Sequence, residues 1–261
     1  MVAEHAGSEP RPDLPELPDR TDVLVVGAGP AGSAAAAWAA RAGRDVLLVD
    51  AATFPRDKTC GDGLTPRAVA ELDRLGLGDW VRTRTVNRGL RLEGFGRSLE
   101  LPWPSGSFPA QGSAVPRTEL DDRIRRVALE SGAAAAEGTK AVAVEREGTR
   151  VTAVTFATAR GPRTVGCERL VVADGVRSPL GRLLGRQWHR DTAYGVAARA
   201  YATSPPQRRP VDHVAPGAAR RRRHAAPGLR LGVPPRHRGR STSAWARSPP
   251  PSGRPSGRCA R

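Results

Sequence analysis

The sequence predicts an α/β fold, a three-layer domain in which helices cover a largely parallel sheet. Three features of the 261 residues predict it. Residues 22–50 read as a strand, a glycine turn, a helix and a second strand. Residues 118–131 have an amphipathic pattern of helical period, and residues 169–174 form another apolar strand. Strands that alternate with helices in this way are typical of a parallel sheet with crossover helices.

The chain begins with a segment that is not expected to fold. Residues 1–20 contain prolines at positions 10, 12, 15 and 18, which interrupt any helix. They carry acidic residues and no apolar core, so they do not resemble a signal peptide. No stretch approaches the roughly 18 apolar residues of a membrane-spanning helix. We therefore expect a disordered lead, order from Asp22 onward, and at most peripheral contact with a membrane.

The first folded unit is predicted to be a strand, a helix and a second strand. Val23–Val26 is a short apolar run, typical of a strand that is buried on both faces. Ser33–Ala42 is rich in alanine, the best helix former, and Gly43 follows where that helix would end. Asp45–Asp50 reads as the second strand. A right-handed crossover should make the two strands parallel.

The following elements are predicted from caps and periodicity. Residues 54–65 form a glycine-rich loop, and Pro66–Leu75 a helix with proline in its first turn. Residues 84–116 read as a strand-rich insert. In the helix at 118–131 the apolar residues share one face, with Thr118 expected to cap it and Gly132 to end it. Further strands are expected at Ala141–Val144 and Val151–Phe156, which form a hairpin-like pair, and at Arg169–Asp174 and Tyr194–Tyr201.

A glycine-rich turn lies between the first predicted strand and helix. Gly27 to Gly32 spell GAGPAG, a GxGxxG pattern, and Asp50 ends the next strand 23 residues after Gly27. In this context the first glycine permits the tight turn, the second lets a pyrophosphate approach the backbone, and the third lets helix and strand pack closely. The helix N-terminus offers N–H groups to phosphates, and Asp50 can accept ribose hydroxyls. The pattern predicts a dinucleotide site, with a purely structural turn as the alternative.

Three shorter motifs are ambiguous when each is taken alone. Lys58–Gly63, with the sequence KTCGDG, reads as a surface loop with one cysteine. Arg117, followed by Leu120 and Asp121, reads as a surface arginine with a helix-stabilising acid. Asp174–Gly175, after Ala173, reads as a turn that ends a strand. Only their order along one chain gives them a functional interpretation.

That order resembles one protein family. GAGPAG, FPRDKTCGDGL, RTELD and ADG with Ser178 after it resemble the FAD-dependent geranylgeranyl reductases, and among them the actinobacterial menaquinone reductases. The resemblance runs from about Asp22 to Thr203, and PRDKTCGDGLTPRAVAEL is its most specific part. It implies a Rossmann-type FAD-binding domain of the hydroxylase and geranylgeranyl-reductase kind. An antiparallel substrate sheet is expected to follow this domain.

The resemblance also implies a cofactor, a reaction and a set of residues. FAD would deliver a hydride to an isoprenoid C=C bond, in a menaquinone side chain or a geranylgeranyl group, and a proton would add to the other carbon. The motifs do not name a catalytic residue, and Cys60 only marks a loop near the flavin. The implied cofactor-binding residues are Gly27, Ala28, Gly29, Pro30, Ala31, Gly32, Asp50, Lys58, Cys60, Gly61, Gly63, Arg117, Ala141, Asp174 and Gly175.

The family is expected to continue well beyond the matched segment, with a second FAD motif and most of the substrate sheet. The strand at Tyr194–Tyr201 is therefore expected to be an exposed edge of a truncated sheet. We expect an inactive, truncated copy of a reductase that binds FAD weakly or not at all. The intact homologue would work in the cytoplasm, peripherally at the inner face of the cell membrane, because menaquinone lies in the bilayer.

The last 58 residues have an unusual composition. Residues 204–261 contain 14 Arg, 11 Pro and one acid, so they carry +13 of the net charge of +16. They contain no Ile, Phe, Tyr or Met. So little apolar surface cannot offset the entropy lost on folding. A disordered basic tail is expected.

The tail is also interpreted as a frameshifted segment that starts near Ser204–Gln207. Permitted codons for Arg208–Pro234 and one residue on either side, read one nucleotide out of frame, yield SDDPWITSHLELRDDDGTLLPGYGWVFP. In the same way Ser241–Ala246 yield VNLGVG. These strings have the composition of a folded protein. YGWVFP also resembles a substrate-channel motif of the same reductase family.

Two other functions stay open. A flavin monooxygenase that hydroxylates aromatics shares GxGxxG and the Asp-Gly element, but the CGDGL loop argues against it. A non-enzymatic protein could bind polyanions through Arg220–Arg223. No specific nucleic-acid partner is expected, because residues 1–203 carry only +3. Cys60, Cys167 and Cys259 form no CxxC pair, which predicts no metal site and a reducing compartment.

Overall fold

The fold is given by a computed structural model, in which two compact units make up the chain. The structure describes residues 16–94, 97–187, 196–203, 212–216, 229–233 and 240–247. Unit 1 consists of Met1–Arg56 and Thr118–Trp188, and unit 2 of Asp57–Arg117 and His189–Arg261. The chain therefore leaves unit 1 after its first two strands and returns to it at the long helix.

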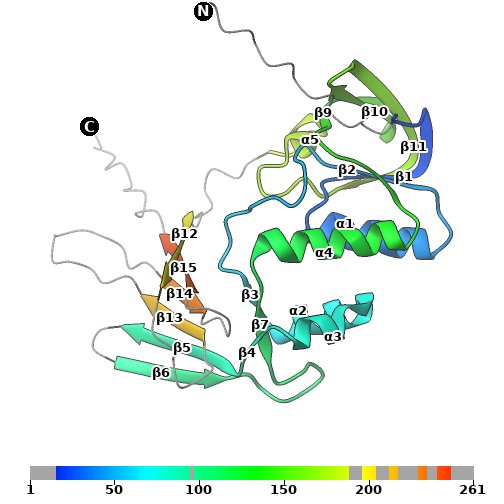
Figure 1. The fold of residues 1–261 in the computed structure, drawn as a ribbon. Coiled ribbons are helices and arrows are strands. Elements are labelled where there is room, and N and C mark those ends of the chain that lie inside the picture. Colours follow the sequence, from blue (N-terminus) through cyan, green and yellow to red (C-terminus); the bar gives the residue numbers. More distant parts are fainter. Residues whose placement is uncertain are drawn as a thin grey trace, which may run out of the picture. The chain divides into compact units, whose positions relative to one another are not determined.

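Unit 1 is built on a six-stranded sheet in the order β8-β2-β1-β11-β10-β9 (Figure 1). The four strands β8, β2, β1 and β11 run parallel, and β10 and β9 continue the sheet as antiparallel strands. The predicted mixed α/β sheet and its hairpin are confirmed. The strands are β1 (Arg20–Val26), β2 (Val46–Val49), β8 (Ala134–Ala136), β9 (Lys140–Glu147), β10 (Arg150–Thr158) and β11 (Gly161–Val172).

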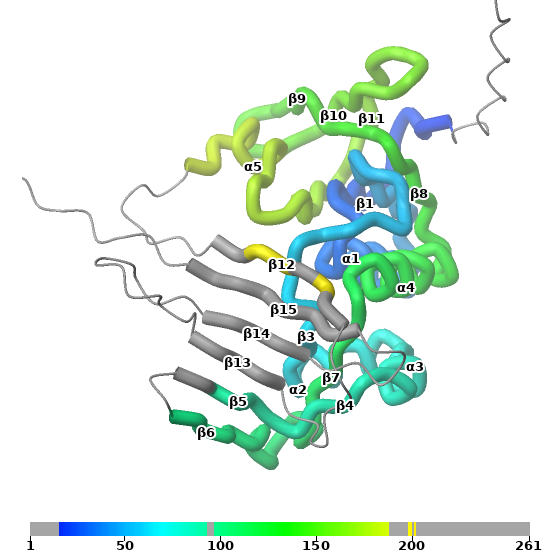
Figure 2. Tube along the Cα trace, turned by 60° about the vertical axis from the view of Figure 1, so that its left-hand side comes forward, coloured from blue at the N-terminus to red at the C-terminus, as the bar shows by residue number. Residues whose placement is uncertain are grey.

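Three helices belong to this sheet: α1 (Pro30–Arg41), α4 (Arg117–Glu130) and α5 (Pro179–Leu183). Helix α1 connects the parallel strands β1 and β2, so the predicted strand–helix–strand unit is confirmed. Helices α1 and α4 lie side by side in both views (Figures 1 and 2), and Arg41 Nε donates to Ser131 Oγ at 3.1 Å. Gly43 and Gly132 follow the two helices with φ of 74° and 104°, as expected of helix-ending glycines.

The predicted cap of the long helix is wrong. Helix α4 begins at Arg117, so Thr118 lies inside its first turn and does not precede it. Pro116 explains the earlier start, because a proline has a φ close to the helical value and leads directly into a helix. The predicted apolar face is confirmed, since Leu120, Ile124 and Val127 are buried.

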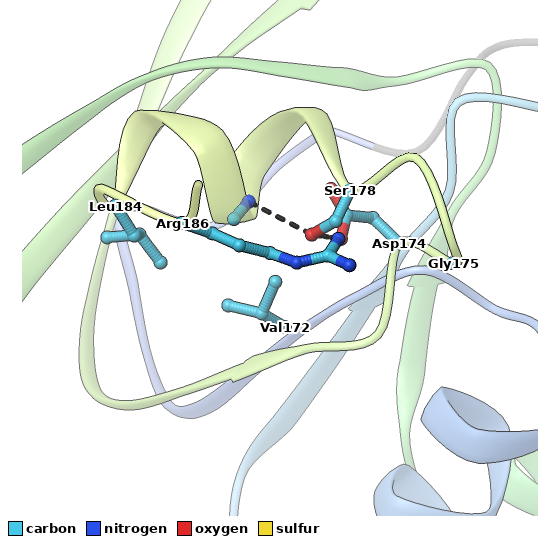
Figure 3. A pocket seen from close by; sticks show the side chains of 7 residues that line it. Val172, Asp174, Gly175, Ser178, Leu184 and Arg186 are labelled. Atoms are coloured by element: carbon cyan, nitrogen blue, oxygen red, sulfur yellow. Dashed lines mark hydrogen bonds between the residues drawn. The ribbon is translucent and has the colours of Figure 1, made fainter. Parts of the chain in front are cut away.

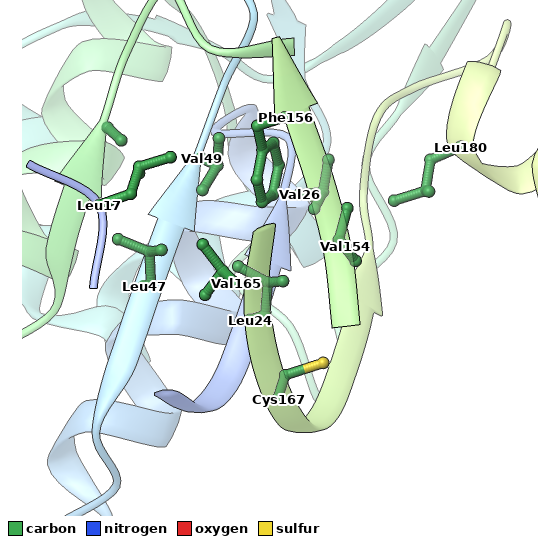
Figure 4. Packing of buried hydrophobic residues seen from close by; sticks show 11 residues of the cluster. Leu17, Leu24, Val26, Leu47, Val49, Val154, Phe156, Val165, Cys167 and Leu180 are labelled. Atoms are coloured by element: carbon green, nitrogen blue, oxygen red, sulfur yellow. The ribbon is translucent and has the colours of Figure 1, made fainter. Parts of the chain in front are cut away.

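The hydrophobic core of unit 1 draws on most strands of the sheet (Figure 4). Leu24, Val49, Phe156 and Val165 are at most 1% exposed. Leu17 packs into the same cluster at 7% exposed, and β1 begins at Arg20. Burial of one leucine side chain contributes about 1.5–3 kcal/mol to folding. The disordered lead predicted for residues 1–20 therefore extends too far along the chain, because Leu17 already belongs to the folded unit. Residues 1–15 lie outside the described part of the chain.

Unit 2 contains two sheets and a short helical segment. The larger sheet has the order β12-β15-β14-β13-β5-β6, and a small sheet has the order β3-β7-β4 (Figure 1). The predicted helix at Pro66–Leu75 is confirmed, because α2 and the first residues of η1 are helical up to Leu75, and Gly76 follows with a φ of 95°. The elements before the long helix are β3 (Gly63–Leu64), α2 (Pro66–Leu72), the π-helical turn η1 (Asp73–Leu77), α3 (Gly78–Arg82), β4 (Thr85–Asn87), β5 (Gly89–Gly94), β6 (Arg97–Pro102) and β7 (Gly112–Ala114).

The prediction of a disordered tail is wrong for three of its segments. β13 (Asp212–Pro216), β14 (Leu229–Val233) and β15 (Arg240–Arg247) join the larger sheet. β12 (Val196–Thr203) pairs with β15, so the expected strand at 194–201 has a partner on one side. Strand pairing uses backbone N–H and C=O groups, which an argument from side-chain composition does not count. Arg220–Arg223, Cys259 and the proposed frameshift point lie outside the described residues.

Candidate dinucleotide-binding site

Three neighbouring strands of unit 1 end at one edge of the sheet, and a predicted site residue follows each. The turn that starts at Gly27 follows β1, Asp50 follows β2, and Asp174 follows β11 after one residue. The N–H of Gly27 donates to Val49 O at 2.7 Å, and the N–H of Ala173 to Val26 O at 2.8 Å. Open α/β sheets bind ligands beyond the carboxyl ends of their strands. The structure thus brings these three predicted elements together.

The three glycines of the turn have different surroundings. A Cβ at Gly27 would lie 2.2 Å from the carbonyl oxygen of Ala173, and a Cβ at Gly32 would lie 1.8 Å from that of Gly27. These two positions therefore have no room for a side chain, and Gly27 has a φ of 107°. At Gly29 the nearest atom of the described residues is Arg56 Nη2, at 3.4 Å. Gly29 is thus the position where another molecule can approach the backbone.

The N-terminus of helix α1 follows Gly29 directly. Gly29 caps the 12-residue helix without a side chain, and Pro30 occupies its first turn. The first N–H groups of a helix have no intrahelical acceptor and carry a partial positive charge. Ser33 Oγ donates to the carbonyl oxygen of Ala28 at 2.9 Å, which fixes the turn against the helix. A phosphate at this end would meet N–H groups of Ala31 and Gly32 and only small side chains.

The carboxylate of Asp50 is held by the backbone. Its Oδ2 accepts the N–H of Ala28 at 2.7 Å, and its Oδ1 accepts the N–H of Ala52 at 2.8 Å. Each carboxylate oxygen has a further lone pair, so Asp50 can also accept ribose hydroxyls. The N–H of Thr139 donates to Asp50 O at 2.9 Å, which brings the segment leading to Ala141 beside this position. These residues fit an adenosine ribose.

Arg56 is a site residue that the sequence motifs did not identify. Its Nη2 is the atom nearest to Gly29, and its guanidinium stacks on the ring of Phe54 at 4.9 Å. Nη1 lies 3.1 Å from Asp121 Oδ2, yet this buried nitrogen makes no well-aligned hydrogen bond. The Arg56 side chain is 19% exposed and that of Asp121 is fully buried. A cation is thus held beside the turn with hydrogen-bonding capacity to spare.

Asp121 therefore has a role other than the one expected from its helix. The sequence presented it as a helix-stabilising acid, whereas in the structure it faces Arg56, 65 positions earlier in the chain. Arg125, on the same helix, also stacks on the ring of Phe54, with its guanidinium carbon 5.3 Å from the ring centre. The same arginine forms an ion pair with Glu137 at 2.9 Å. Glu137 also accepts the N–H of Phe54 at 2.8 Å. The loop after β2 is thereby fixed to the first turns of α4 and to the end of β8.

The Asp174–Gly175 turn lines a pocket of about 440 Å³ (Figure 3). Asp174 Oδ1 accepts the hydroxyl of Ser178 at 2.5 Å, and its Oδ2 accepts the N–H of Leu180 at 2.8 Å. Ser178 Oγ in turn accepts the N–H of Gly181 at 3.1 Å. Asp174 and Ser178 thus accept backbone N–H groups of the first residues of helix α5. The carboxylate of Asp174 therefore fixes the turn that leads into this helix. The pocket is lined by Val172, Asp174, Gly175, Ser178, Gly181, Leu184 and Arg186.

The remaining predicted residues, Lys58, Cys60, Gly61, Gly63 and Arg117, belong to unit 2. The first four lie in one loop, where Cys60 is half-buried and Gly63 opens strand β3. Arg117 lies near this loop, because its charge is among the causes that lower the pKa of a carboxyl group there.

Within that loop, Asp62 is buried and has a φ of 58°, and its carbonyl oxygen accepts the N–H of Val115 at 3.0 Å. A hydrogen bond from Arg199 holds the pKa of the Asp57 carboxyl below its ordinary value.

Burial raises the pKa of the Cys167 thiol, which lies in the core of unit 1. Neither Cys60 nor Cys167 belongs to a set of metal ligands, since the described residues contain no group of three or more His, Cys, Asp or Glu that could hold a metal ion. No helix in the described residues is long and apolar enough to cross a membrane.

Comparison with known families and sequences places these features among flavoproteins. A family model described as an FAD binding domain matches residues 20–251. A menaquinone reductase of Mycolicibacterium smegmatis is 64% identical over 166 residues, and a menaquinone reductase of Mycobacterium tuberculosis is 63% identical over 164 residues. Each match covers 63% of this chain and 40% of the relative. The matched part thus spans about two fifths of these relatives.

Solved structures of lower identity share the fold. A geranylgeranyl bacteriochlorophyll reductase-like protein from Thermoplasma acidophilum has a TM-score of 0.74 at 23% identity, with 88% of this chain and 57% of that chain covered. The myxobacterial chondrochloren halogenase has a TM-score of 0.70 at 21% identity, with coverages of 88% and 53%. A probable FAD-dependent monooxygenase from Pseudomonas aeruginosa has a TM-score of 0.70 at 20% identity, with coverages of 88% and 61%.

Proposed function

Because the chain belongs to the FAD-binding domain family, we propose that it is the cofactor-binding part of an FAD-dependent reductase that acts on an isoprenoid C=C bond. The observation that carries the proposal is the 64% identity over 166 residues to a protein named menaquinone reductase. The fold shared with a geranylgeranyl reductase-like protein is consistent with it. The substrate would be a quinone with an unsaturated isoprenoid side chain, or a geranylgeranyl group.

Unit 1 would hold the ADP part of FAD at the carboxyl edge of its sheet. Gly29 and the first turn of α1 would receive the pyrophosphate, and Arg56 would add a positive charge beside it. Asp50 would accept the ribose hydroxyls through the lone pairs that its two backbone bonds leave free. Ala141 would present its backbone to the adenine. The residues present therefore fit the adenosine and phosphate groups of the cofactor.

The chemistry itself requires a hydride donor, which reduced FAD supplies when it is bound. A bare alkene has no carbonyl to polarise, so the contribution of the protein is orientation, exclusion of water and a proton source. The loop with Lys58, Cys60, Gly61 and Gly63 would line the flavin side, with Arg117 near the phosphate and ribityl groups. Asp174 and Gly175 would support the cofactor through the turn that they form.

We also propose a location for the intact reductase. A substrate with an isoprenoid tail lies in the bilayer, so the enzyme would contact the inner face of the cell membrane peripherally, from the cytoplasm. The exposed Leu99 and Leu101 on β6 are apolar side chains available for such a contact. Binding of the purified chain to vesicles with and without menaquinone tests this location.

A flavin-dependent monooxygenase is the second candidate, because a halogenase and a probable monooxygenase share the fold with equal coverage of this chain. The two candidates differ in their need for oxygen. The test uses FAD-loaded protein in which the reading frame after Thr203 has been restored. This protein is incubated with a chemical reductant and menaquinone, without oxygen and in air, and the products are analysed by mass spectrometry. A product heavier by two hydrogen atoms supports the reductase, and a hydroxylated product that forms only in air supports the monooxygenase.

The frameshift remains our proposal for the segment that begins near Ser204–Gln207. It is supported by the protein-like string that the shifted frame yields over Arg208–Pro234. On this proposal the 261-residue chain has no turnover, and restoring the frame yields an active reductase. DNA sequencing across these codons tests it. A shifted frame that stays open and encodes a Gly-Asp flavin motif supports the proposal, whereas a frame that closes at once overturns it.

A further inference from the structure

A charge cluster around the buried Asp62 connects strand β12 of unit 2 to the loop Asp57–Gly63. The guanidinium of Arg199, which lies on β12, is 7% exposed. It is some 140 positions away from the loop in the sequence.

Arg199 contacts three points of the loop. Its Nη2 bonds both carboxylate oxygens of Asp57, with Oδ2 at 2.5 Å. Its Nη1 bonds the carbonyl oxygen of Lys58 at 3.2 Å and Asp62 Oδ1 at 3.1 Å. Cys60 lies between these contacts in the sequence. A planar guanidinium can serve all three acceptors at once, which a lysine ammonium on a flexible stem cannot do in the same geometry.

Tyr201, two positions further along the strand, supplies a second anchor on the same face. Its hydroxyl donates to Asp62 Oδ2 at 2.9 Å, and its ring lies 4.7 Å from the Arg199 guanidinium. Both oxygens of Asp62 are therefore bound, and the side chain is only 2% exposed. A non-glycine residue with a φ of 58° persists only where its surroundings hold it. Arg199 and Tyr201 hold the Asp62 side chain, and the N–H of Val115 holds its carbonyl oxygen.

The two anchors are stable near neutral pH. Burial, together with the neighbouring Asp62 carboxylate, raises the pKa of Tyr201 to about 12, so its hydroxyl remains a hydrogen-bond donor. The hydrogen bond from Arg199 lowers the pKa of Asp57, which stays ionised. Asp57 and Asp62 face the guanidinium directly, and Arg117 adds positive charge near Asp57. The cluster therefore acts as a permanent clamp and not as a switch.

We propose that Arg199 and Tyr201 are positioning residues that hold the loop Asp57–Gly63, with Cys60 near its centre, in the conformation presented to the cofactor. The proposal rests on the proposed function, because the flavin side is assigned to this loop by the family resemblance. It extends that function to a strand outside the predicted cofactor motifs.

The first arm of the test needs no cofactor. The full chain with Cys259→Ser leaves Cys60 as the accessible thiol, with buried Cys167 as a slow internal reference. Thiol-labelling rate and amide hydrogen exchange are measured in this parent and in Arg199→Gln, Arg199→Lys and Tyr201→Phe. Arg91→Gln is the matched control, because Arg91 lies in the same sheet and pairs with Glu100 on the neighbouring strand β6.

Arg199→Gln is expected to speed labelling of Cys60 by about fivefold or more and to increase exchange locally in residues 57–63, because the loop then opens at lower cost. Arg199→Lys keeps the positive charge but lacks the planar guanidinium that binds several acceptors at once, so it should speed labelling of Cys60 to a similar extent. Tyr201→Phe should have a smaller effect, and Arg91→Gln should stay within about twofold of the parent. A folded Arg199→Gln chain with parental labelling and exchange overturns the proposal.

If Arg199→Gln does not fold, Asp57→Asn replaces it. Asp57 is 57% exposed, so this change removes one contact of the clamp without emptying a buried site. It should speed Cys60 labelling by about twofold or more. An unchanged rate in this variant overturns the proposal in the same way.

The second arm uses FAD and separates the two proposals. Bound FAD is expected to slow labelling of Cys60 in the parent but not in Arg199→Gln. If FAD binds both chains and protects Cys60 equally, the positioning role is overturned. If the parent does not bind FAD, the proposed function fails, while the loop clamp is still judged by the first arm.

Discussion

Alanine at Gly32 or at Gly29 should separate folding from cofactor binding. At Gly32 the new Cβ would lie 1.8 Å from the carbonyl oxygen of Gly27, where ordinary contact begins at 3.4 Å. Helix α1 and the turn must therefore move apart by more than an ångström, and such overpacking costs about 1–3 kcal/mol or more. A Cβ at Gly29 would lie 3.4 Å from its nearest neighbour, Arg56 Nη2, which is ordinary van der Waals contact, so the fold should lose less than about 0.5 kcal/mol.

Thermal unfolding and FAD titration measure the two effects. A loss of about 3 kcal/mol in a domain of this size lowers Tm by roughly 6–12 °C, whereas Gly29→Ala should change Tm by less than about 2 °C. Gly29→Ala should nevertheless weaken FAD binding by about tenfold or more, because its methyl group occupies the place where a phosphate approaches the backbone. Fluorescence quenching of FAD gives the affinity.

Gly43→Ala is the matched control for glycine replacement. Gly43 has a φ of 74° with nothing within 4 Å of a new Cβ, so the change strains the backbone away from the site. It should lower stability by about 1 kcal/mol and leave the FAD affinity of the folded chain unchanged. The reasoning is refuted if Gly29→Ala unfolds as readily as Gly32→Ala, or if it binds FAD as tightly as the parent.

Three further predictions concern single side chains. Asp121→Asn removes the buried partner of Arg56 and should weaken FAD binding by about threefold or more in a titration, since Arg56 is then less firmly held beside the turn; unchanged affinity contradicts it. Asp50→Ala removes the ribose acceptor and should weaken calorimetric FAD binding by about tenfold, and equal binding to parent and variant would contradict the assignment. In a Tyr194→Phe chain the ultraviolet titration of Tyr201 should have its midpoint at about 12. The ordinary pKa is about 10, so the folded state holds the proton more tightly, and the stability from this bond is complete below pH of about 10 and is lost as the pH rises towards 12. A midpoint near 10 in the folded chain contradicts the contact with Asp62.

The first strand–helix–strand unit was predictable because its signals are local. An apolar run, the glycine turn and an alanine-rich helix each act over a few residues, and they correspond to β1, α1 and β2. The clustering of Gly29, Asp50 and Asp174 was also predictable, since parallel strands bring their carboxyl ends to one edge of a sheet.

The rest depends on contacts between distant segments. Arg56 and Asp121 form their ion pair across 65 positions, and Arg199 reaches Asp62 across 137, so no local spacing reveals either contact. The sequence shows Asp121 in RTELD and Arg56 in FPRDK, but nothing in it predicts that these two residues form an ion pair. Strands β13 to β15 were missed because the argument used the average composition of the whole tail, whereas these three segments contain only one of its 11 prolines and so keep nearly all of their backbone donors.

Competition binding with parts of the cofactor tests the central claim most directly, that the carboxyl edge of the unit 1 sheet holds the ADP part of FAD. FAD is titrated into the full 261-residue chain by calorimetry, and the titration is repeated with saturating ADP and with FMN. We predict weak but saturable binding of one FAD per chain, because the edge of the unit 1 sheet is present and the second FAD motif expected of the family is not, with competition by ADP and little competition by FMN. Absence of saturable FAD binding, or competition by FMN but not by ADP, would contradict the account.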